Sequence, residues 1–151
     1  MNNKIFSTVL KRKLSEDNEL TINVSGISMM PTILSGDKLI IQSFHNYHIG
    51  DVLVFFYEKN KLLVHRLLKI NNAIYYCKGD NSFRIEQISS DQIIGKVVYI
   101  VRNNEMLGLP ETDEDLINMS YLVNEEFTRC GYDITRTKQS KIYREYEQKY
   151  L

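Results

Sequence analysis

One stretch organises the chain: it runs from Val24 to Asp37 and reads VSGISMMPTILSGD. It begins as a strand, breaks at Gly26 and ends in a Gly-Asp turn that leads into an apolar strand over 38–44. The pattern between these points predicts one or two helical turns over 29–34. A serine on a sharp turn after a strand presents its hydroxyl and its backbone N–H outward, as a nucleophile must. Ser28 is therefore the candidate nucleophile.

The composition predicts one globular domain with a sizeable core. The chain has 151 residues, of which 43% are apolar and 25% charged. Basic and acidic residues number 19 each, so the basic excess of a general nucleic-acid binder is missing and no nucleic-acid partner is expected. Two cysteines (Cys77, Cys130) and three histidines (His45, His48, His65) show no metal-ligand spacing. We expect neither a metal nor another cofactor.

Nothing in the sequence predicts a membrane span or a secretion signal. No run of about 18 apolar residues exists. The apolar run over 5–10 is too short for a signal-peptide core, and no small-residue cleavage site follows it. Two isolated cysteines are typical of free thiols in a reducing compartment. We therefore expect a cytoplasmic protein without a transmembrane anchor.

Apolar alternation and apolar runs predict a β domain over residues 19–104. The segment 51–57 is almost continuously apolar, which indicates a strand buried on both faces. Gly95 is expected at a bulge or a close backbone approach. We expect turns over 46–50, 58–61 and 71–72, a loop over 83–91, and strands over 19–25, 38–44, 51–57, 62–70, 73–78 and 93–102.

Helices are expected on both sides of this domain. Within an N-terminal segment 1–18, residues 3–14 predict a short amphipathic helix with Ile5, Val9 and Leu10 on one side. It would dock on the domain; a partner protein and a weakly contacted anionic membrane are the alternatives. Residues 110–151 predict an αα-hairpin that caps the domain or recruits a substrate or partner protein.

The boundaries of this hairpin follow from capping signals. Thr112 or Asp113 would begin its first helix and Gly131 would end it, and the second helix would span 136–150. The apolar positions are Leu116, Met119, Leu122, Val123 and Phe127 in the first helix, and Ile142, Tyr143, Tyr146 and Tyr150 in the second.

His65 is the candidate base. A serine hydroxyl is a weak nucleophile until a base takes its proton, and His65 is a histidine inside an apolar strand, followed by Arg66. The alternative is a histidine that is satisfied by ordinary core or surface contacts. His45 and His48 lie in a polar turn and are expected to be solvated.

Four boxes in order resemble those of the type I signal peptidases and the related SOS-repressor self-cleaving domains. The first is the stretch 25–33 with the Gly-Asp pair at 36–37. The others are 50–55 (GDVLVF), 64–66 (VHR), and 78–82 (KGDNS) followed by 94–97 (IGKV). One such box is moderately specific, whereas four in the same order at plausible spacing form a specific pattern.

The resemblance covers about residues 20–101 and implies a mainly β, signal-peptidase-like fold, either a mixed β barrel or a coiled sheet. Bacterial-type members place a lysine before the arginine where this chain has His65-Arg66, while the endoplasmic-reticulum and archaeal type places a histidine there. The resemblance therefore implies the histidine-type branch, with Ser28 as nucleophile and His65 as general base and acid.

The resemblance also implies an acid that holds the histidine tautomer. Asp80 lies in the KGDNS box and is the favoured candidate, although its carboxylate could instead bond the backbone of its own turn. Glu86 falls where simple counting places the acid of the eukaryotic relatives. Asp91, just before the last strand, is the third candidate.

The remaining site residues follow from the same box. The backbone N–H of Ser28 would donate to the oxyanion, with the Ser25 side chain as a second donor or simply a strand-end serine. Met29 and Met30 would line a substrate pocket or fill the core. The substrate would be an extended peptide that adds a strand to a sheet edge.

Together these features predict a soluble serine endopeptidase that processes a peptide or protein precursor, for example by removing the leader of a ribosomally made peptide. Two alternatives remain open: a non-catalytic peptide-binding or regulatory module on the same fold, and a self-cleaving regulator.

Overall fold

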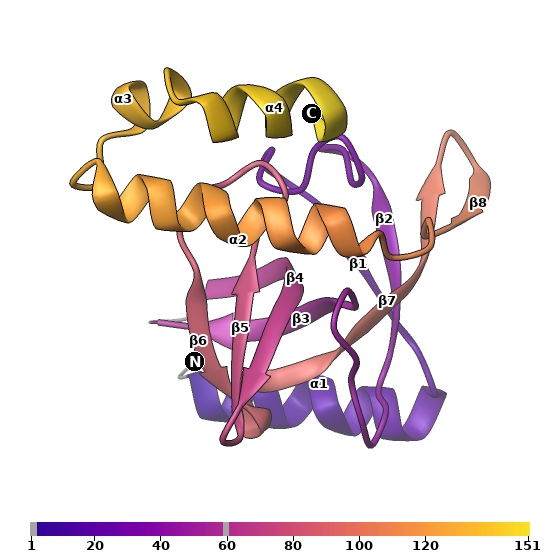
Figure 1. Cartoon of the computed structure of the whole chain (residues 1–151). Helices are drawn as coiled ribbons and strands as arrows, with labels where there is room; N and C mark the ends of the chain where they lie inside the picture. Colours follow the sequence, from indigo (N-terminus) through magenta and orange to yellow (C-terminus); the bar gives the residue numbers. More distant parts are fainter. Residues whose placement is uncertain (1–2, 59–60) are drawn as a thin grey trace.

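A computed structural model describes residues 3–58 and 61–151 of the chain. Helices stand at both ends of a β-sheet body (Figure 1). In chain order the elements are α1 (Asn3–Asp17), β1 (Leu20–Asn23), β2 (Lys38–Gln42), β3 (Val52–Tyr57), β4 (Lys61–Asn71), β5 (Ile74–Lys78), β6 (Glu86–Ser89), the 3₁₀ turn η1 (Ser90–Gln92), β7 (Ile93–Arg102), β8 (Glu105–Gly108), α2 (Glu114–Arg129), α3 (Ile134–Lys138) and α4 (Lys141–Tyr150).

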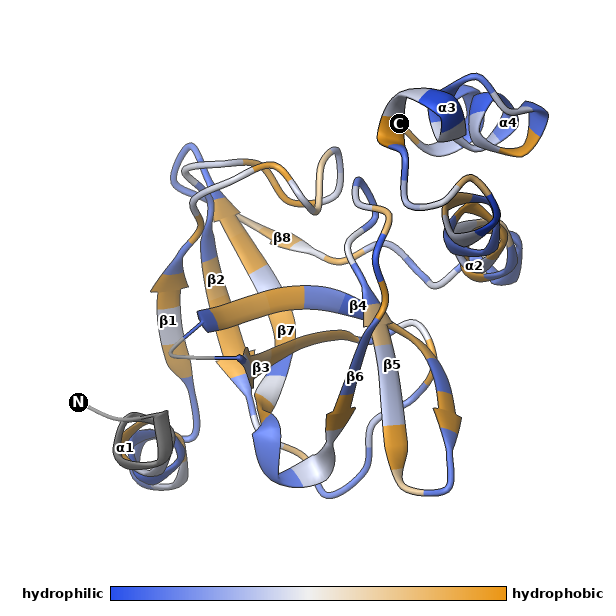
Figure 2. Cartoon of the chain, turned by 90° about the vertical axis from the view of Figure 1, so that its left-hand side faces the viewer, coloured by the Kyte–Doolittle hydropathy of each residue, from blue (hydrophilic) through white to orange (hydrophobic). Residues whose placement is uncertain are grey.

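The strands form one antiparallel sheet that does not close. Its order is β1-β2-β7-β3-β4-β5-β6, and β8 pairs with β7. The sheet is strongly coiled, so that β3 and β4 run across the direction of β2 and β7 (Figure 2). The expected mainly β, signal-peptidase-like fold is thus confirmed, in the coiled-sheet form rather than as a closed barrel.

The central strand β3 divides the core in two. Alternate side chains of a strand point to opposite faces, and every residue of β3 except its last is buried. Val52, Val54 and Phe56 join one cluster, and Leu53 and Phe55 join the other. The prediction of a strand buried on both faces is confirmed.

Gly95 lies at both a bulge and a close approach. Val54 pairs with Gly95 while Phe55 pairs with Ile93, so one residue of β7 is left over. A Cβ atom on Gly95 would lie 2.5 Å from the carbonyl oxygen of Gln42 on the neighbouring strand β2. The prediction for this glycine is therefore confirmed.

Three expectations about local structure need correction. The expected loop 83–91 contains strand β6 and turn η1, and an additional strand, β8, follows β7. The second C-terminal helix is interrupted, because Ser140 caps a new helix, α4, by accepting a hydrogen bond from the Tyr143 N–H. Residues 29–34, by contrast, contain one helical turn as expected, closed by a bond from the Ile33 N–H to the Met29 carbonyl. The tip of the expected turn 58–61 lies outside the described residues.

The N-terminal helix docks on the sheet through a shifted face. Leu14 is buried beside Leu20 in the larger core cluster, and Leu10 packs against it. Val9, expected on the apolar face, is 50% exposed. The side chain of Ile5 lies outside the described residues.

The C-terminal helices cover the opposite end of the molecule (Figure 1). Asp113 caps α2 by accepting from the Asp115 N–H, as expected for one of the two proposed caps. Val123, Phe127, Tyr143 and Tyr146 are buried between the helices and the sheet domain, whereas Leu122 is exposed. No helix within residues 3–58 and 61–151 has the length and apolar character that would span a bilayer.

Lys78 links the sheet to these helices. Its side chain is fully buried, and its ammonium group donates to the Ser120 hydroxyl at 2.9 Å and to the Gly79 carbonyl at 3.1 Å. The Tyr146 ring lies 5.3 Å from the same nitrogen. Burial lowers the pKa of Lys78 from 10.5 to about 8, although the charges of Asp80 and Glu86 oppose the shift.

We expect Lys78→Met to remove a pH dependence of stability. Between a folded pKa of about 8 and an unfolded pKa of 10.5, the unfolded chain holds a proton that folded Lys78 has released. The free energy of unfolding of the wild type should therefore rise with pH across this window, relative to the variant, by up to about 3 kcal/mol. Urea unfolding of both proteins at about pH 7 and about pH 10 measures this difference. Equal pH dependence in the two proteins would contradict the assignment.

Candidate active site

The candidate nucleophile and base are in contact. The Ser28 hydroxyl lies 3.1 Å from Nε2 of His65, across 37 positions of sequence. Ser28 is half-buried on the turn after β1, and His65 is buried in β4. This distance is within hydrogen-bond reach, which is the first requirement for a base that activates a serine.

Glu86 is the acid that contacts His65. Its carboxylate lies 2.9 Å from Nδ1 of the imidazole, and both side chains are about nine-tenths buried. An ionised carboxylate accepts only, so it holds the proton on Nδ1 and leaves the Nε2 lone pair for the Ser28 hydroxyl. The imidazole and the Phe55 ring form a T-shaped pair with centroids 6.2 Å apart. The imidazole is thereby fixed on two sides.

Asp80, the favoured acid, faces a different partner. Its carboxylate accepts two hydrogen bonds of 2.8 Å from Nε and an Nη of Arg66, and a third of 3.0 Å from the Thr32 hydroxyl. Neighbouring residues of a strand point to opposite faces, so the side chains of His65 and Arg66 lie on opposite faces of β4. Asp80, which is bound to Arg66, therefore lies on the face away from His65. Asp80 is corrected from a partner of His65 to a partner of Arg66. Asp91 is exposed and bonds the Ser89 hydroxyl instead.

Arg66 is held as a buried cation. Its third contact is a 3.0 Å hydrogen bond to the Gly50 carbonyl, and its side chain is only 6% exposed. Burial alone would lower the pKa of Arg66, but the hydrogen bonds and charge of Asp80 outweigh it, and the pKa is raised. Bidentate pairing of this kind also fixes orientation.

The KGDNS turn clamps the serine turn. The backbone N–H of Asn81 donates to the Ser28 carbonyl at 2.8 Å, and its side-chain amide donates to the Ile27 carbonyl at 3.1 Å. The approach is so close that a Cβ on Gly79 would lie 2.5 Å from the Ser28 carbonyl oxygen and 3.0 Å from Nε2 of His65. Only glycine leaves room here for the contact between serine and histidine.

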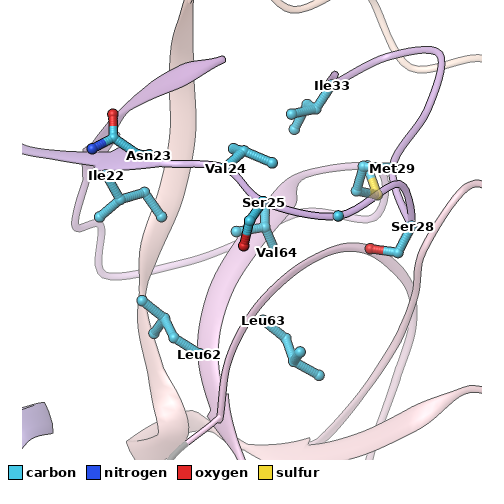
Figure 3. A pocket seen from close by; sticks show the side chains of 11 residues that line it. Ile22, Asn23, Val24, Ser25, Ser28, Met29, Ile33, Leu62, Leu63 and Val64 are labelled. Carbon is cyan, nitrogen blue, oxygen red and sulfur yellow. The ribbon is translucent and has the colours of Figure 1, made fainter. Parts of the chain in front are cut away.

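The oxyanion candidates border a cavity. No described residue accepts a hydrogen bond from the Ser28 N–H, and no described residue bonds the Ser25 hydroxyl. Both serines line a cavity of about 230 Å³, with the Ser28 hydroxyl at one end and Ile22 and Asn23 at the other (Figure 3). Both groups are thus available to a molecule in this cavity.

The cavity lies between two strand edges that have no strand partner among the described residues. β1 pairs with β2 alone, so its outer edge is open. On the other side of the cavity, β4 pairs with β5 only over residues 66–71, so the edge of residues 62–64 of β4 is open as well. Apolar side chains complete the lining: Ile22, Val24, Met29, Ile33, Leu62, Leu63 and Val64.

The two candidate pocket methionines differ in position. Met29 lines the cavity, belongs to the core cluster and accepts the Asp80 N–H on its sulfur at 3.4 Å. Met30 is half-buried and is not among the lining residues. His45 and His48 are exposed, Cys77 and Cys130 are free and buried, and the described residues hold no cluster of three or more His, Cys, Asp or Glu side chains suited to a metal.

Sequence reasoning missed the residues that position the site. Thr32 and Asn81 both lie in quoted boxes, and their polar side chains at turn positions were the available signal. The hydroxyl of Tyr146 donates to the Asp80 carbonyl at 2.6 Å, a link between segments 66 positions apart that periodicity could not reveal.

The open, coiled antiparallel sheet thus brings a serine and a histidine into contact. Residues 5–98 match the family model described as Peptidase S24-like. This segment is more than half of the chain, and the chain belongs to that family. A search of curated proteins finds no match.

The different partners of Asp80 and Glu86 predict different costs of replacement. Asp80→Ala leaves Arg66 as a buried, unpaired charge and should lower the free energy of unfolding by about 3–5 kcal/mol. Glu86→Gln keeps an acceptor for Nδ1 of His65 and should cost about 1 kcal/mol. Urea unfolding measures both. Equal losses, or a larger loss for Glu86→Gln, would contradict the assignment of partners.

Proposed function

We propose that the chain is a serine endopeptidase of the histidine type, with Ser28 as nucleophile, His65 as base and Glu86 as the acid behind it. The observation that carries this proposal is the continuous contact from the Ser28 hydroxyl through His65 to Glu86, beside an apolar cavity. Membership of the Peptidase S24-like family supports it.

The geometry supports the usual order of steps. Nε2 of His65 takes the hydroxyl proton as the Ser28 oxygen attacks the substrate carbonyl. Glu86 stabilises the imidazolium that forms. The backbone N–H of Ser28, with the Ser25 hydroxyl as a second donor, receives the negative charge on the carbonyl oxygen. His65 then gives its proton to the leaving amine, and a water molecule activated in the same way releases the acyl group.

The substrate in this proposal is an extended peptide. The open edges of β1 and of 62–64 in β4 offer backbone N–H and carbonyl groups on both sides of the cavity. A peptide strand laid between them would satisfy these groups, and its side chains would enter the apolar lining. Met29 belongs to this lining in the proposal, and Met30 does not.

We further propose that the substrate is a precursor processed in the cytoplasm, such as the leader of a ribosomally made peptide. The two free cysteines suit a reducing compartment. The balanced charge gives no reason to invoke a nucleic-acid partner. Mass spectrometry of small peptides incubated with the chain identifies the substrate class, and a cleavage of the chain itself at raised pH would point to a self-cleaving regulator instead.

Ser28→Ala should abolish labelling by a fluorophosphonate probe, because the probe reacts with an activated serine oxygen. His65→Ala should slow labelling by roughly 10²- to 10⁴-fold, since the base is lost, and Glu86→Gln should slow it less. The labelling rate of each variant is measured by mass spectrometry of the intact chain. Ser43→Ala serves as the control serine, because Ser43 is exposed and does not line the cavity, and it should keep the wild-type labelling rate. Labelling that persists in Ser28→Ala would overturn the assignment.

Leu62→Trp should fill part of the cavity and block peptides without affecting the chemistry. The bulkier ring narrows the space between the strand edges, so KM for a cleaved peptide should rise by roughly tenfold while the small fluorophosphonate still labels Ser28. Ile70→Trp is the matched control, because Ile70 is exposed on the same strand and does not line the cavity. Equal KM values for both variants would exclude the cavity as the peptide site.

A further inference from the structure

The C-terminal helices contact the catalytic centre through one turn. Residues 79–82 clamp Ser28 through Asn81 and fix Arg66, next to His65, through Asp80. The same turn is held from its other side by α2 and α4. These helices begin at Glu114, beyond the segment 5–98 that matches the family.

Contacts with the helices hold this turn at three points: just before it, within it and just after it. Before it, Lys78 donates to Ser120 of α2 at 2.9 Å. Within it, the Tyr146 hydroxyl of α4 donates to the Asp80 carbonyl at 2.6 Å. The Tyr146 ring also lies 5.3 Å from the Lys78 ammonium nitrogen, so these contacts form one buried cluster between the sheet and the helices.

Just after the turn, the aromatic side chain of Phe83 packs against the helices. Phe83 lies between Phe127 of α2 and Tyr143 of α4, with ring centroids 5.5 Å away in both cases. The Phe83 carbonyl accepts a 2.9 Å hydrogen bond from the side chain of Asn124. Because these contacts fix the turn at both ends, it cannot shift as a whole. The hydrogen bond from Tyr146 in the middle of the turn therefore determines how Asp80 and Asn81 are oriented.

We propose that α4 is part of the positioning machinery of the active site, with Tyr146 as a positioning residue that holds the 79–82 turn against Ser28. This inference rests on the proposed function. Tyr146 is not among the residues that line the cavity, and its hydroxyl bonds the Asp80 carbonyl rather than Ser28. It acts through that carbonyl, because the next residue, Asn81, donates to the Ser28 carbonyl at 2.8 Å. A small displacement of a reacting group costs a large factor in rate.

Tyr146→Phe tests the proposal, because it removes the hydroxyl and keeps the ring. Its control is Tyr150→Phe, the same change one turn along α4: Tyr150 bonds Asp113 and Asp115 and makes no hydrogen bond to the turn. Both variants loosen the helical unit, but only Tyr146→Phe releases the Asp80 carbonyl.

Two readouts are taken on the full chain. Amide hydrogen exchange over 79–83 and 26–30 should accelerate in Tyr146→Phe and stay at the wild-type rate in Tyr150→Phe. The fluorophosphonate labelling rate, and kcat for a cleaved peptide, should fall by about tenfold in Tyr146→Phe with KM unchanged, since the cavity is untouched.

The outcomes separate the two proposals. Wild-type exchange and labelling in Tyr146→Phe, or equal losses in both tyrosine variants, would overturn the positioning role while the peptidase proposal stands. A wild-type chain that does not label would overturn the peptidase proposal, and the exchange rates alone would then decide whether Tyr146 holds the turn.

Discussion

The buried ion pair between Arg66 and Asp80 is the interaction on which the rest of the site depends. Arg66 follows the candidate base in β4, and Asp80 precedes Asn81, which holds the serine turn. The pair therefore fixes the strand of the base relative to the turn that carries the nucleophile. Taking both charges out of water is costly, and the pairing offsets this cost only if the remaining donors and acceptors find partners. Thr32 and the Gly50 carbonyl supply those partners.

A buried ion pair of this kind contributes more to the geometry of the site than to the stability of the fold. Buried ion pairs can often be replaced by apolar side chains of similar volume without loss of stability, but an apolar pair would not hold Thr32 of the serine turn by a hydrogen bond. The pairing of Asp80 with Arg66 also explains why a second carboxylate, that of Glu86, is the one that contacts His65. Both oxygens of Asp80 are taken up by the guanidinium, and they lie away from the imidazole. Glu86, at the start of β6, contacts Nδ1 of His65, while Gly79 leaves room on the Nε2 side of the ring.

The fold could be predicted from the sequence wherever the buried residues are apolar. The prediction failed where polar residues are buried or where local signals are weak. Strand β3 was predictable because its apolar residues serve both faces. Strand β6 was not, because one of its two buried positions is the carboxylate Glu86. β8 had a usable signal, since Asn103 and Asn104 adopt the left-handed geometry of a tight hairpin turn. The boxes singled out Ser28 and His65 as the candidate pair, and the two side chains are in contact. The choice between Asp80 and Glu86 as the partner of His65 required knowing which face Arg66 occupies.

Binding and positioning depend on different parts of the molecule. The cavity is built by two open strand edges and the apolar residues on them, all within the sheet domain. The serine turn is held from the opposite direction, by residues 79–82 and the helices behind them. Among the described residues, the two parts meet at the short stretch around Ser28 and Met29. In the proposed mechanism, a change in the helices would therefore alter the chemistry without altering the cavity. In the proposed mechanism the helical unit would set the rate of the reaction, whereas the sheet edges would select the peptide that binds.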